Sequence, residues 1–276
     1  MSKSSLFFIS GSGGAGKNTL INALINQNPE YKFLLSHTSR PKRVDDRKEG
    51  QYIHVTKEEF EEKIKNKEML EYDIFGENYY GVSKETIKEH ATTGDVLLKD
   101  LTVKGVINAK NLLQDKMSVI GIFLTVSKKT IKERLKQRKT LHLLKEKLKP
   151  YKEEQSYMPL YDYAIYNTNL DETIEFSKAI IDTTINKDII LTLESSQKIL
   201  EKDVEKYINK INKNKKLKPI EVTVIDGKMY IIKDSAKYLA AIKTGTNILK
   251  MYKPLKNKPI PPENSEDWIN LVKSYM

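Results

Sequence analysis

The chain has 276 residues and no cysteine, and its formal charge at pH 7 is +11. This length suits one large domain or two ordinary ones. The lack of cysteine excludes disulfides, zinc–thiolate sites and a cysteine nucleophile. No apolar run approaches the roughly 20 residues of a membrane span, and the apolar run at residues 6–9 is too short for a signal peptide. We therefore expect a cytoplasmic protein.

The positive charge is unevenly distributed along the chain. Residues 1–190 carry 31 Lys and Arg against 27 Asp and Glu, whereas residues 191–276 carry 17 against 10. A basic balance favours partners that bear phosphate, among them nucleic acid. The alternative is that the lysine-rich composition is general to the source of the protein.

A glycine-rich segment near the N-terminus follows an apolar strand pattern and precedes a helical one. Residues 11–19 read GSGGAGKNT between the apolar residues 6–9 and the helical pattern of residues 20–25. Strand, glycine loop and helix are the context of the phosphate-binding P-loop, in which backbone N–H groups and the helix N-terminus face a phosphate. We predict that the ATP phosphates are bound by Gly11, Gly13, Gly14, Ala15, Gly16, Lys17, Asn18 and Thr19, with Lys17 at the terminal phosphates.

One position in this loop departs from the usual pattern. The residue after the lysine is normally Ser or Thr, whose hydroxyl ligates Mg²⁺, but here it is Asn18, followed by Thr19. An amide oxygen is still a hard donor that suits Mg²⁺. We therefore predict Asn18 as a magnesium ligand.

Residues 28–92 contain further polar motifs between short apolar segments. Residues 36–43 read SHTSRPKR, and two arginines beside hydroxyls suit a dianionic phosphate, since a guanidinium group can bind two oxygens at once. Residues 52–55 are a probable strand. Thr56 with Glu59 forms a capping box, which predicts a helix that continues to Met69. The motifs LEY at 70–72 and GENYYG at 76–81 follow.

The order of these motifs resembles that of the guanylate kinase family. The resemblance continues in GDVLLKD at 94–100, RLKQR at 134–138 and YDYAIYN at 161–167, and it covers about residues 4–185. It implies an α/β fold, a P-loop kinase whose parallel sheet is flanked by helices. It also implies a domain of residues 1–188, with an inserted acceptor subdomain at about 36–92 and a lid at about 128–152.

The resemblance assigns roles to individual residues of the acceptor subdomain. Glu71 would accept hydrogen bonds from the two adjacent N–H donors of guanine, which suits a carboxylate because it is an acceptor only. Two departures concern the base: Val82 and Thr102 stand where the family usually has a hydroxyl and a second aspartate. The base could therefore be guanine or a different or modified one. The acceptor phosphate would be held by Ser36, Arg40, Arg43, Tyr52 and Tyr80, with Val82 beside the base.

The lid and the neighbouring motifs supply the remaining expected site residues. Arg134 and Arg138 lie four residues apart on one predicted helix face and would stabilise the migrating phosphoryl group together with Lys17. The family supplies a further lid arginine where Lys147 is the nearest match here. Asp100 would support the metal ion, and Asn167 would lie at the adenine side. The alternative for the lid is a solvent-facing basic helix.

Residues 189–276 extend beyond the length of this family. A helix over residues 195–211, a strand from residue 218, the turn Asp226-Gly227 and a helix that Asp234 or Ser235 caps and that ends before Gly245 resemble the ParB/sulfiredoxin-like fold. We expect a small α+β C-terminal domain over 189–276, followed by a tail with a short helix around Trp268. Because the Gly and Arg of that fold's signature are missing at residues 233–237, we expect a binding or scaffolding module.

Three functions remain open at this point. The first is a nucleoside monophosphate kinase that transfers the γ-phosphoryl group of ATP to GMP or dGMP with Mg²⁺. The second is a guanylate kinase-like binding module without turnover. The third is a kinase that acts on a modified nucleotide or base in DNA, with the basic C-terminal segment in contact with the nucleic acid. The sequence leaves the oligomeric state unassigned.

Overall fold

The computed structural model describes residues 4–42, 52–90, 93–113, 117–255, 259 and 265–276. These residues form two compact units, Met1–Gly11 with Lys17–Gly121, and Ser12–Gly16 with Ile122–Met276. Within the described residues, no helix is long and apolar enough to cross a membrane.

The first unit contains a parallel sheet with the strand order β1–β7–β2. Its central pair places Phe8 opposite Lys99 and Ile9 opposite Asp100. Leu6, Phe7, Phe8 and Ile9 are fully buried, which confirms the strand predicted before the glycine loop. The elements are β1 (Ser5–Gly11), α1 (Lys17–Gln27), β2 (Tyr31–Phe33), β7 (Val96–Asp100), α4 (Val103–Leu113) and the first part of β8 (Ser118–Thr125).

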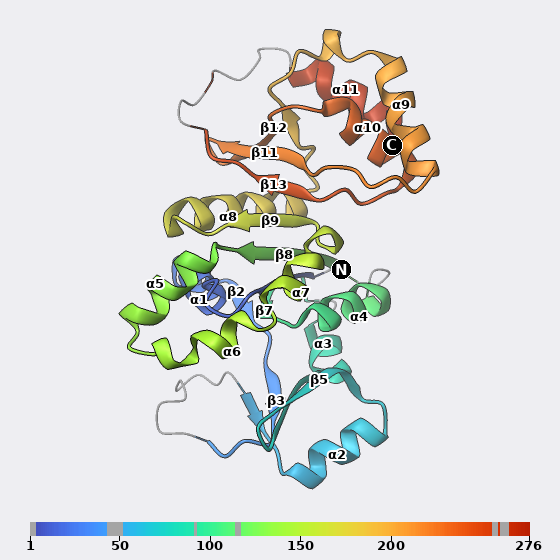
Figure 1. Cartoon of the computed structure of the whole chain (residues 1–276). Helices are drawn as coiled ribbons and strands as arrows, with labels where there is room; N and C mark the ends of the chain where they lie inside the picture. Colours follow the sequence, from blue (N-terminus) through green and yellow to red (C-terminus); the bar gives the residue numbers. More distant parts are fainter. Residues whose placement is uncertain (1–3, 43–51, 91–92, 114–116, 256–258, 260–264) are drawn as a thin grey trace. The chain divides into compact units, whose positions relative to one another are not determined.

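A four-stranded mixed sheet, with the order β4–β3–β6–β5, also belongs to the first unit (Figure 1). The predicted capping box is confirmed, because Thr56 Oγ1 accepts from Glu59 N and Glu59 Oε2 accepts from Thr56 N. The helix ends at Lys65 and not at Met69, which begins a strand instead. The elements are β3 (Ser36–Thr38), β4 (Tyr52–His54), α2 (Lys57–Lys65), β5 (Met69–Phe75), β6 (Asn78–Ser83) and α3 (Lys84–His90).

The second unit is built on a sheet that runs β8–β9–β13–β11–β12–β10. Neighbouring strands in this sheet are parallel except for β11 and β12, which pair antiparallel. The predicted hairpin turn at Asp226-Gly227 connects these two strands. Both hairpin residues have positive φ, as a type I′ turn requires. The strands are β9 (Tyr163–Tyr166), β10 (Leu191–Thr192), β11 (Ile220–Ile225), β12 (Lys228–Ile231) and β13 (Lys250–Tyr252).

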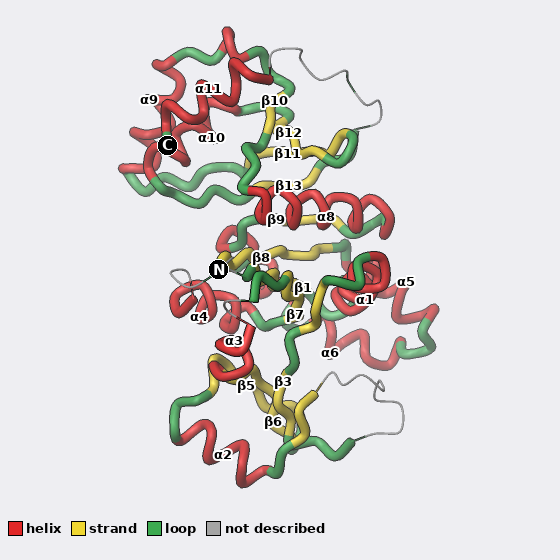
Figure 2. Tube along the Cα trace, turned by 180° about the vertical axis from the view of Figure 1, so that it is seen from behind, coloured by secondary structure: helices red, strands yellow, loops and turns green. Residues whose placement is uncertain are grey.

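The helices of the second unit fall into an earlier and a later group, and α9, α10 and α11 lie together in the later one (Figure 2). In α11, Trp268 is 1% exposed and its Nε1 donates to Ile190 O at 2.8 Å. The helices are α5 (Lys128–Gln137), η1 (Leu141–Leu143), α6 (Leu144–Leu148), α7 (Tyr151–Ser156), η2 (Met158–Leu160), α8 (Leu170–Asn186), η3 (Ser196–Lys198), α9 (Glu201–Asn212), α10 (Ser235–Thr244) and α11 (Ser265–Tyr275).

The strands of residues 189–276 continue the sheet of the second unit. Strand β13 pairs in parallel with β9, so Lys250 lies opposite Tyr163 and Met251 opposite Ala164. The ring of Tyr252 also stacks on Phe176, with centroids 4.4 Å apart. The predicted domain boundary after residue 188 lies inside this compact unit. A separate domain of residues 189–276 stays a prediction.

The predicted cap of α10 is also different in the structure. Asp234 stands at the N-cap position in a left-handed conformation, and neither its side chain nor that of Ser235 makes a capping bond. Glu194 Oε2 accepts from Ser235 N at 2.6 Å instead. The cap comes from 41 residues earlier in the chain, which local sequence rules do not consider.

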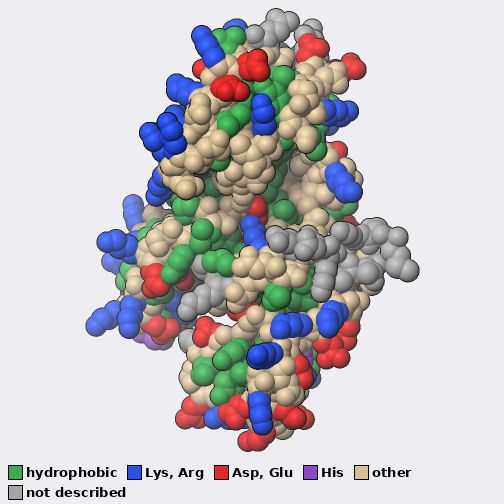
Figure 3. Space-filling view, turned by 90° about the vertical axis from the view of Figure 1, so that its right-hand side faces the viewer, with side chains coloured by type: hydrophobic (Ala, Val, Ile, Leu, Met, Phe, Trp, Pro, Cys, Tyr) green, Lys and Arg blue, Asp and Glu red, His purple; other side chains and the backbone are tan. Residues whose placement is uncertain are grey.

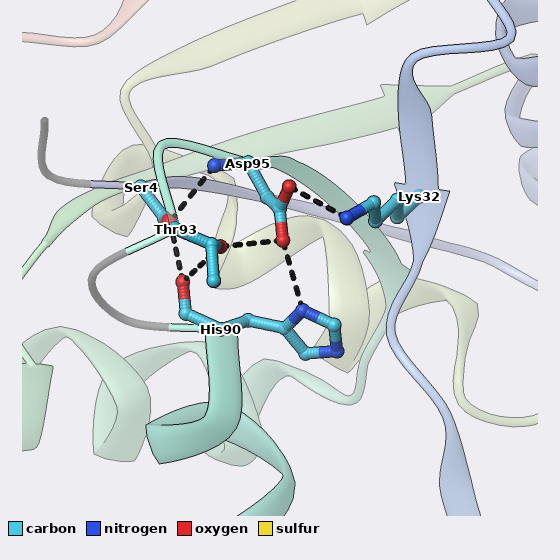
Figure 4. A network of polar contacts seen from close by, with 5 residues as sticks. All are labelled: Ser4, Lys32, His90, Thr93 and Asp95. Carbon is cyan, nitrogen blue, oxygen red and sulfur yellow. Dashed lines mark hydrogen bonds and ion pairs between the residues drawn. The ribbon is translucent and has the colours of Figure 1, made fainter.

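Asp95 is the centre of a polar network at the start of β7 (Figure 4). Its carboxylate accepts from Lys32 Nζ at 2.7 Å and lies 3.0 Å from His90 Nδ1, and Thr93 Oγ1 donates to it. Ser4 Oγ accepts from Asp95 N. Burial alone would raise the pKa of Asp95, but these hydrogen bonds outweigh it and lower the pKa to about 2.

We predict that removal of residues 189–276 destabilises the rest of the chain. The truncation would expose the edge of β9 and the ring of Phe176, and an unpaired edge strand promotes association. Thermal unfolding and size-exclusion chromatography of residues 1–188 should show a lower Tm and aggregation relative to the full chain. A truncated chain that is monomeric with an unchanged Tm would contradict this role of β13.

We predict that Asp95 makes folding stability depend on acid pH. Because its folded pKa is below the value of 3.8 for a free aspartate, its stabilisation is complete above about pH 5 and is lost as the pH falls towards 2. The shift corresponds to at most about 2 kcal/mol. Urea unfolding between pH 2 and 7 should show this dependence in the wild type and lose it in Asp95→Asn. The exposed Asp188→Asn is the matched control, and equal pH dependence in both variants would refute the assignment.

Candidate active site

Three glycines of the predicted phosphate-binding loop have positive φ. Gly11, Gly14 and Gly16 have φ values of 135°, 89° and 99°, a region that residues with a Cβ rarely adopt. Lys17, the first residue of α1, donates from Nζ to Gly11 O at 2.6 Å. The ammonium group of Lys17 thus points back to the end of β1, and its role at a terminal phosphate stays a prediction.

In the second unit, Arg134 and Asn167 hold the carbonyl groups of the loop. Arg134 Nη1 donates to Gly14 O at 3.2 Å and to Ala15 O at 2.9 Å, and its Nη2 donates to Asn167 O at 2.6 Å. Asn167, which is 2% exposed, donates from Nδ2 to Ala15 O at 2.8 Å. A Cβ on Gly16 would lie 2.6 Å from this nitrogen, so glycine is required there for packing as well.

The lid also contacts the loop in the second unit. A Cβ on Gly13 would lie 2.6 Å from Cδ of Lys147, so the aliphatic part of this lid lysine covers the loop. Gln155 of α7 also contacts the loop, because its Nε2 donates to Ser12 Oγ at 3.4 Å. The Oε1 of Gln155 accepts from Thr125 Oγ1 at 2.9 Å. That Lys147 takes the place of the family's further lid arginine stays a prediction.

The other predicted donor-side residues are more exposed. Arg138 is the exposed C-cap of α5. The pKa of Arg134 is lowered mainly because Arg134 is partly buried, and the nearby charge of Arg138 lowers it further. Asn18 and Thr19 are exposed in the first turn of α1, so their oxygens are accessible to a hydrated Mg²⁺ ion, which such hard donors suit. Among the described residues, no group of three or more His, Asp or Glu side chains could hold a metal ion.

The small sheet of the first unit brings most of the predicted phosphate-binding residues together. Its register places Ser36 opposite Tyr52 and Thr38 opposite Tyr80. The rings of Tyr52 and Tyr80 are 5.9 Å apart, and Cζ of Arg40 lies 5.5 Å from the Tyr52 ring centroid. Arg40 is 8% exposed and donates from Nη1 to Pro41 O. Arg43 lies outside the described residues.

Glu71 lies on the neighbouring strand, with its side chain against the start of α4. Thr102 Oγ1 donates to Glu71 Oε2 at 3.1 Å and accepts from Gly105 N. A Cβ on Gly105 would lie 2.7 Å from the same carboxylate oxygen. Burial raises the pKa of Glu71, and the Thr102 hydrogen bond and the charge of Lys99 oppose the rise. Val82, opposite Glu71 in the register, is fully buried and offers no hydrogen-bonding group.

Asp100 ends β7 with its side chain 37% exposed, and its Oδ1 lies 3.6 Å from Lys99 Nζ. An aspartate at this strand end was expected, but its ion pair with the preceding lysine was not. Sequence reasoning also missed the contacts of Gln155 with Ser12, and of Thr173 with Asn167 Oδ1. A charged residue in an otherwise apolar strand is the one signal that could have pointed to Lys99.

Comparison with known proteins identifies the relatives of this arrangement. A family profile described as "Guanylate kinase" matches residues 3–184. The guanylate kinase of Mycoplasmoides gallisepticum is 33% identical over 180 residues, which are 64% of this chain and 91% of that protein. The guanylate kinase of Fusobacterium nucleatum is 31% identical over 187 residues, 67% of this chain and 100% of that protein.

A solved structure shares the fold. The crystal structure of guanylate kinase from Anaplasma phagocytophilum has a TM-score of 0.52 and 22% identity, and the match covers 66% of this chain and 86% of that one. The ParB/sulfiredoxin-like resemblance of residues 189–276 is not supported by these comparisons and stays a prediction. The family profile, the relatives and the shared fold show that this chain belongs to the guanylate kinase family.

Proposed function

We propose that the chain transfers the γ-phosphoryl group of ATP to GMP or dGMP, giving the diphosphate and ADP. The observation that carries this proposal is the small sheet, whose register gathers Ser36, Tyr52 and Tyr80 while Glu71 lies one strand away. Hydroxyls with Arg40 suit a phosphate dianion, and Glu71 suits a base with adjacent N–H donors. Because the reaction uses ATP and a nucleoside monophosphate, we expect it in the cytoplasm.

The hydrogen bond from Thr102 to Glu71 supports guanine as the base of the acceptor nucleotide. Thr102 stands where a second aspartate was expected, yet its hydroxyl donates to Glu71 and fixes one carboxylate oxygen. The remaining lone pairs of the carboxylate can accept from N1–H and the 2-amino group of guanine. The buried Val82 removes one polar contact to the base, so selectivity would depend mainly on Glu71.

On the donor side, the residues present suit ATP with Mg²⁺. The ion supplies charge neutralisation of the phosphates, and Asn18 would hold it, with Asp100 as the expected support. The backbone N–H groups of the glycine loop would bind phosphate oxygens. Lys17 would lie at the terminal phosphate, and Arg138 would stabilise the charge on the migrating group. No covalent intermediate is needed, because positioning and electrostatics dominate this chemistry.

Arg134 would act in part through the loop. Its guanidinium donates to two loop carbonyls and to Asn167 O, and these bonds would hold the loop in a phosphate-binding conformation. Its charge would also contribute to the field at the phosphates.

A second candidate function follows from the lysines of α9, through which the protein would contact nucleic acid. A shallow pocket of about 560 Å³ is lined by Lys202, Glu205, Lys206, Asn209, Lys210, Lys213 and Lys215. In Figure 1, α9 lies at the upper right, and Figure 3 shows the molecule from that side. Several Lys and Arg side chains, in blue, lie in the upper part of this view. Such a row of ammonium groups suits a phosphate backbone. It would let the kinase act near DNA, including on a modified nucleotide.

We predict that Lys17→Ala lowers turnover of GMP with ATP at least about a thousandfold, because it removes the charge at the terminal phosphate. ADP release would be measured with GMP, dGMP, AMP, dTMP and a single-stranded oligonucleotide. Lys228→Ala, which changes an exposed lysine, is the matched control, and circular dichroism would confirm folding. Full activity of Lys17→Ala would remove the loop from the mechanism. A wild type that binds ATP but uses no acceptor would be a binding module.

We predict that changing Lys202, Lys206, Lys210 and Lys213 together to Gln weakens binding of a labelled single-stranded DNA at least about tenfold at low salt. Fluorescence anisotropy at 50 and 200 mM salt should also show a shallower salt dependence. The matched control changes the exposed Lys57, Lys65, Lys67 and Lys228 to Gln. Equal losses in both variants would assign the binding to net charge rather than to α9.

A further inference from the structure

Gln155 of α7 contacts two segments of the second unit at once, the glycine loop and the end of β8. Its Nε2 donates to Ser12 Oγ at 3.4 Å, and its Oε1 accepts from Thr125 Oγ1 at 2.9 Å. Both hydroxyl groups are on buried residues, since Ser12 is fully buried and Thr125 is 1% exposed. Buried polar groups are hydrogen-bonded in folded proteins, and the amide of Gln155 serves both of these hydroxyls.

The two bonds of Gln155 complete a closed ring of hydrogen bonds that includes the loop. Thr125 O accepts from Asn167 N at 2.9 Å, and Asn167 Nδ2 donates to Ala15 O at 2.8 Å. Within the loop, Ala15 N donates to Ser12 O at 3.0 Å. The ring therefore leaves the loop at Ser12 and returns to it at Ala15. A loop that is held at two points loses less freedom when it binds a ligand.

Helix α7 is anchored to the end of β8 by a second side chain. Tyr151, the first residue of α7, donates from its hydroxyl to Val126 O at 2.9 Å. Gln155 follows four residues later on the same face of the helix. The preceding helix α6 contains Lys147, whose aliphatic chain lies over Gly13 of the loop. The predicted lid thus ends in a helix that is fixed to the sheet and to the loop.

We propose that Gln155 is a positioning residue of the donor site, which ties the end of the predicted lid to the glycine loop and keeps the loop in a shape that binds ATP. The inference rests on the ATP binding that the proposed function includes. Gln155 acts through the loop, because its amide is engaged by Ser12 and Thr125. The loop N–H groups can meet phosphate oxygens only while the loop keeps its shape.

The test removes the amide of Gln155 and measures the donor and the acceptor nucleotide separately. Gln155→Met keeps the length of the side chain but loses the amide donor and acceptor. We expect KM for ATP to rise at least about fivefold and KM for GMP to change less than about twofold, since the loop belongs to the donor site. Titration calorimetry of the full chain with ADP should show a similar loss of affinity. Circular dichroism and the Tm would report on folding.

Gln137→Met is the matched control, because Gln137 is an exposed glutamine of α5 in the same unit. We expect it to leave both KM values unchanged. Thr125→Val should raise KM for ATP, whereas Thr125→Ser keeps the hydroxyl and should behave as the wild type. Gln155→Met combined with Thr125→Val should be no worse than Gln155→Met alone, because the two residues act through a shared contact.

The outcomes separate this inference from the proposed function. Unchanged ADP affinity and KM for ATP in Gln155→Met would overturn the inference, and so would a lower Tm without a change in either value. If Gln155→Met does not fold, Thr125→Val decides by the same criteria. A wild type that binds ADP but does not phosphorylate GMP would overturn the proposed function, while the ADP affinities of the variants would still decide the inference. A wild type that binds no ADP would overturn both.

Discussion

The carbonyl groups of the glycine loop need hydrogen-bond donors, and the candidate phosphate site depends on these donors. A loop that turns its N–H groups towards a phosphate turns its carbonyls the other way, and buried carbonyls need donors. Arg134 and Asn167 are those donors, and they come from residues 134 and 167, far from the loop in the sequence. Thr173 in turn fixes Asn167. The loop is thus held by a chain of hydrogen bonds that begins in α8.

The same reasoning connects residues 189–276 with the hydrogen bonds that hold the glycine loop. Strand β9 carries Asn167 just beyond its end, and β13 pairs along the other side of this strand. A segment that completes the sheet also fixes the position of the strand end. The extension is therefore part of the scaffold in the second unit, and lysines of its helix α9 line a pocket.

Short-range patterns predicted well the features that short-range physics determines. The capping box of α2 and the hairpin at Asp226-Gly227 both depend on residues within a few positions of one another. The features that sequence reasoning missed depend on distant partners. Glu194 as a helix cap, Gln155 beside Ser12 and the pairing of β13 with β9 each join segments that only the folded chain brings together. Arg43, expected at the acceptor phosphate, lies outside the described residues.

The position of Trp268 makes the extension observable on its own. It is the one tryptophan of the chain, and it is buried in α11 with its indole N–H bonded to Ile190 O. Indole emission depends on the polarity around the ring, so intrinsic fluorescence excited at the tryptophan band reports on the packing of α11 alone. The many tyrosines, by contrast, report on the whole chain. The two signals allow the order in which α11 and the rest of the protein unfold to be followed without any label.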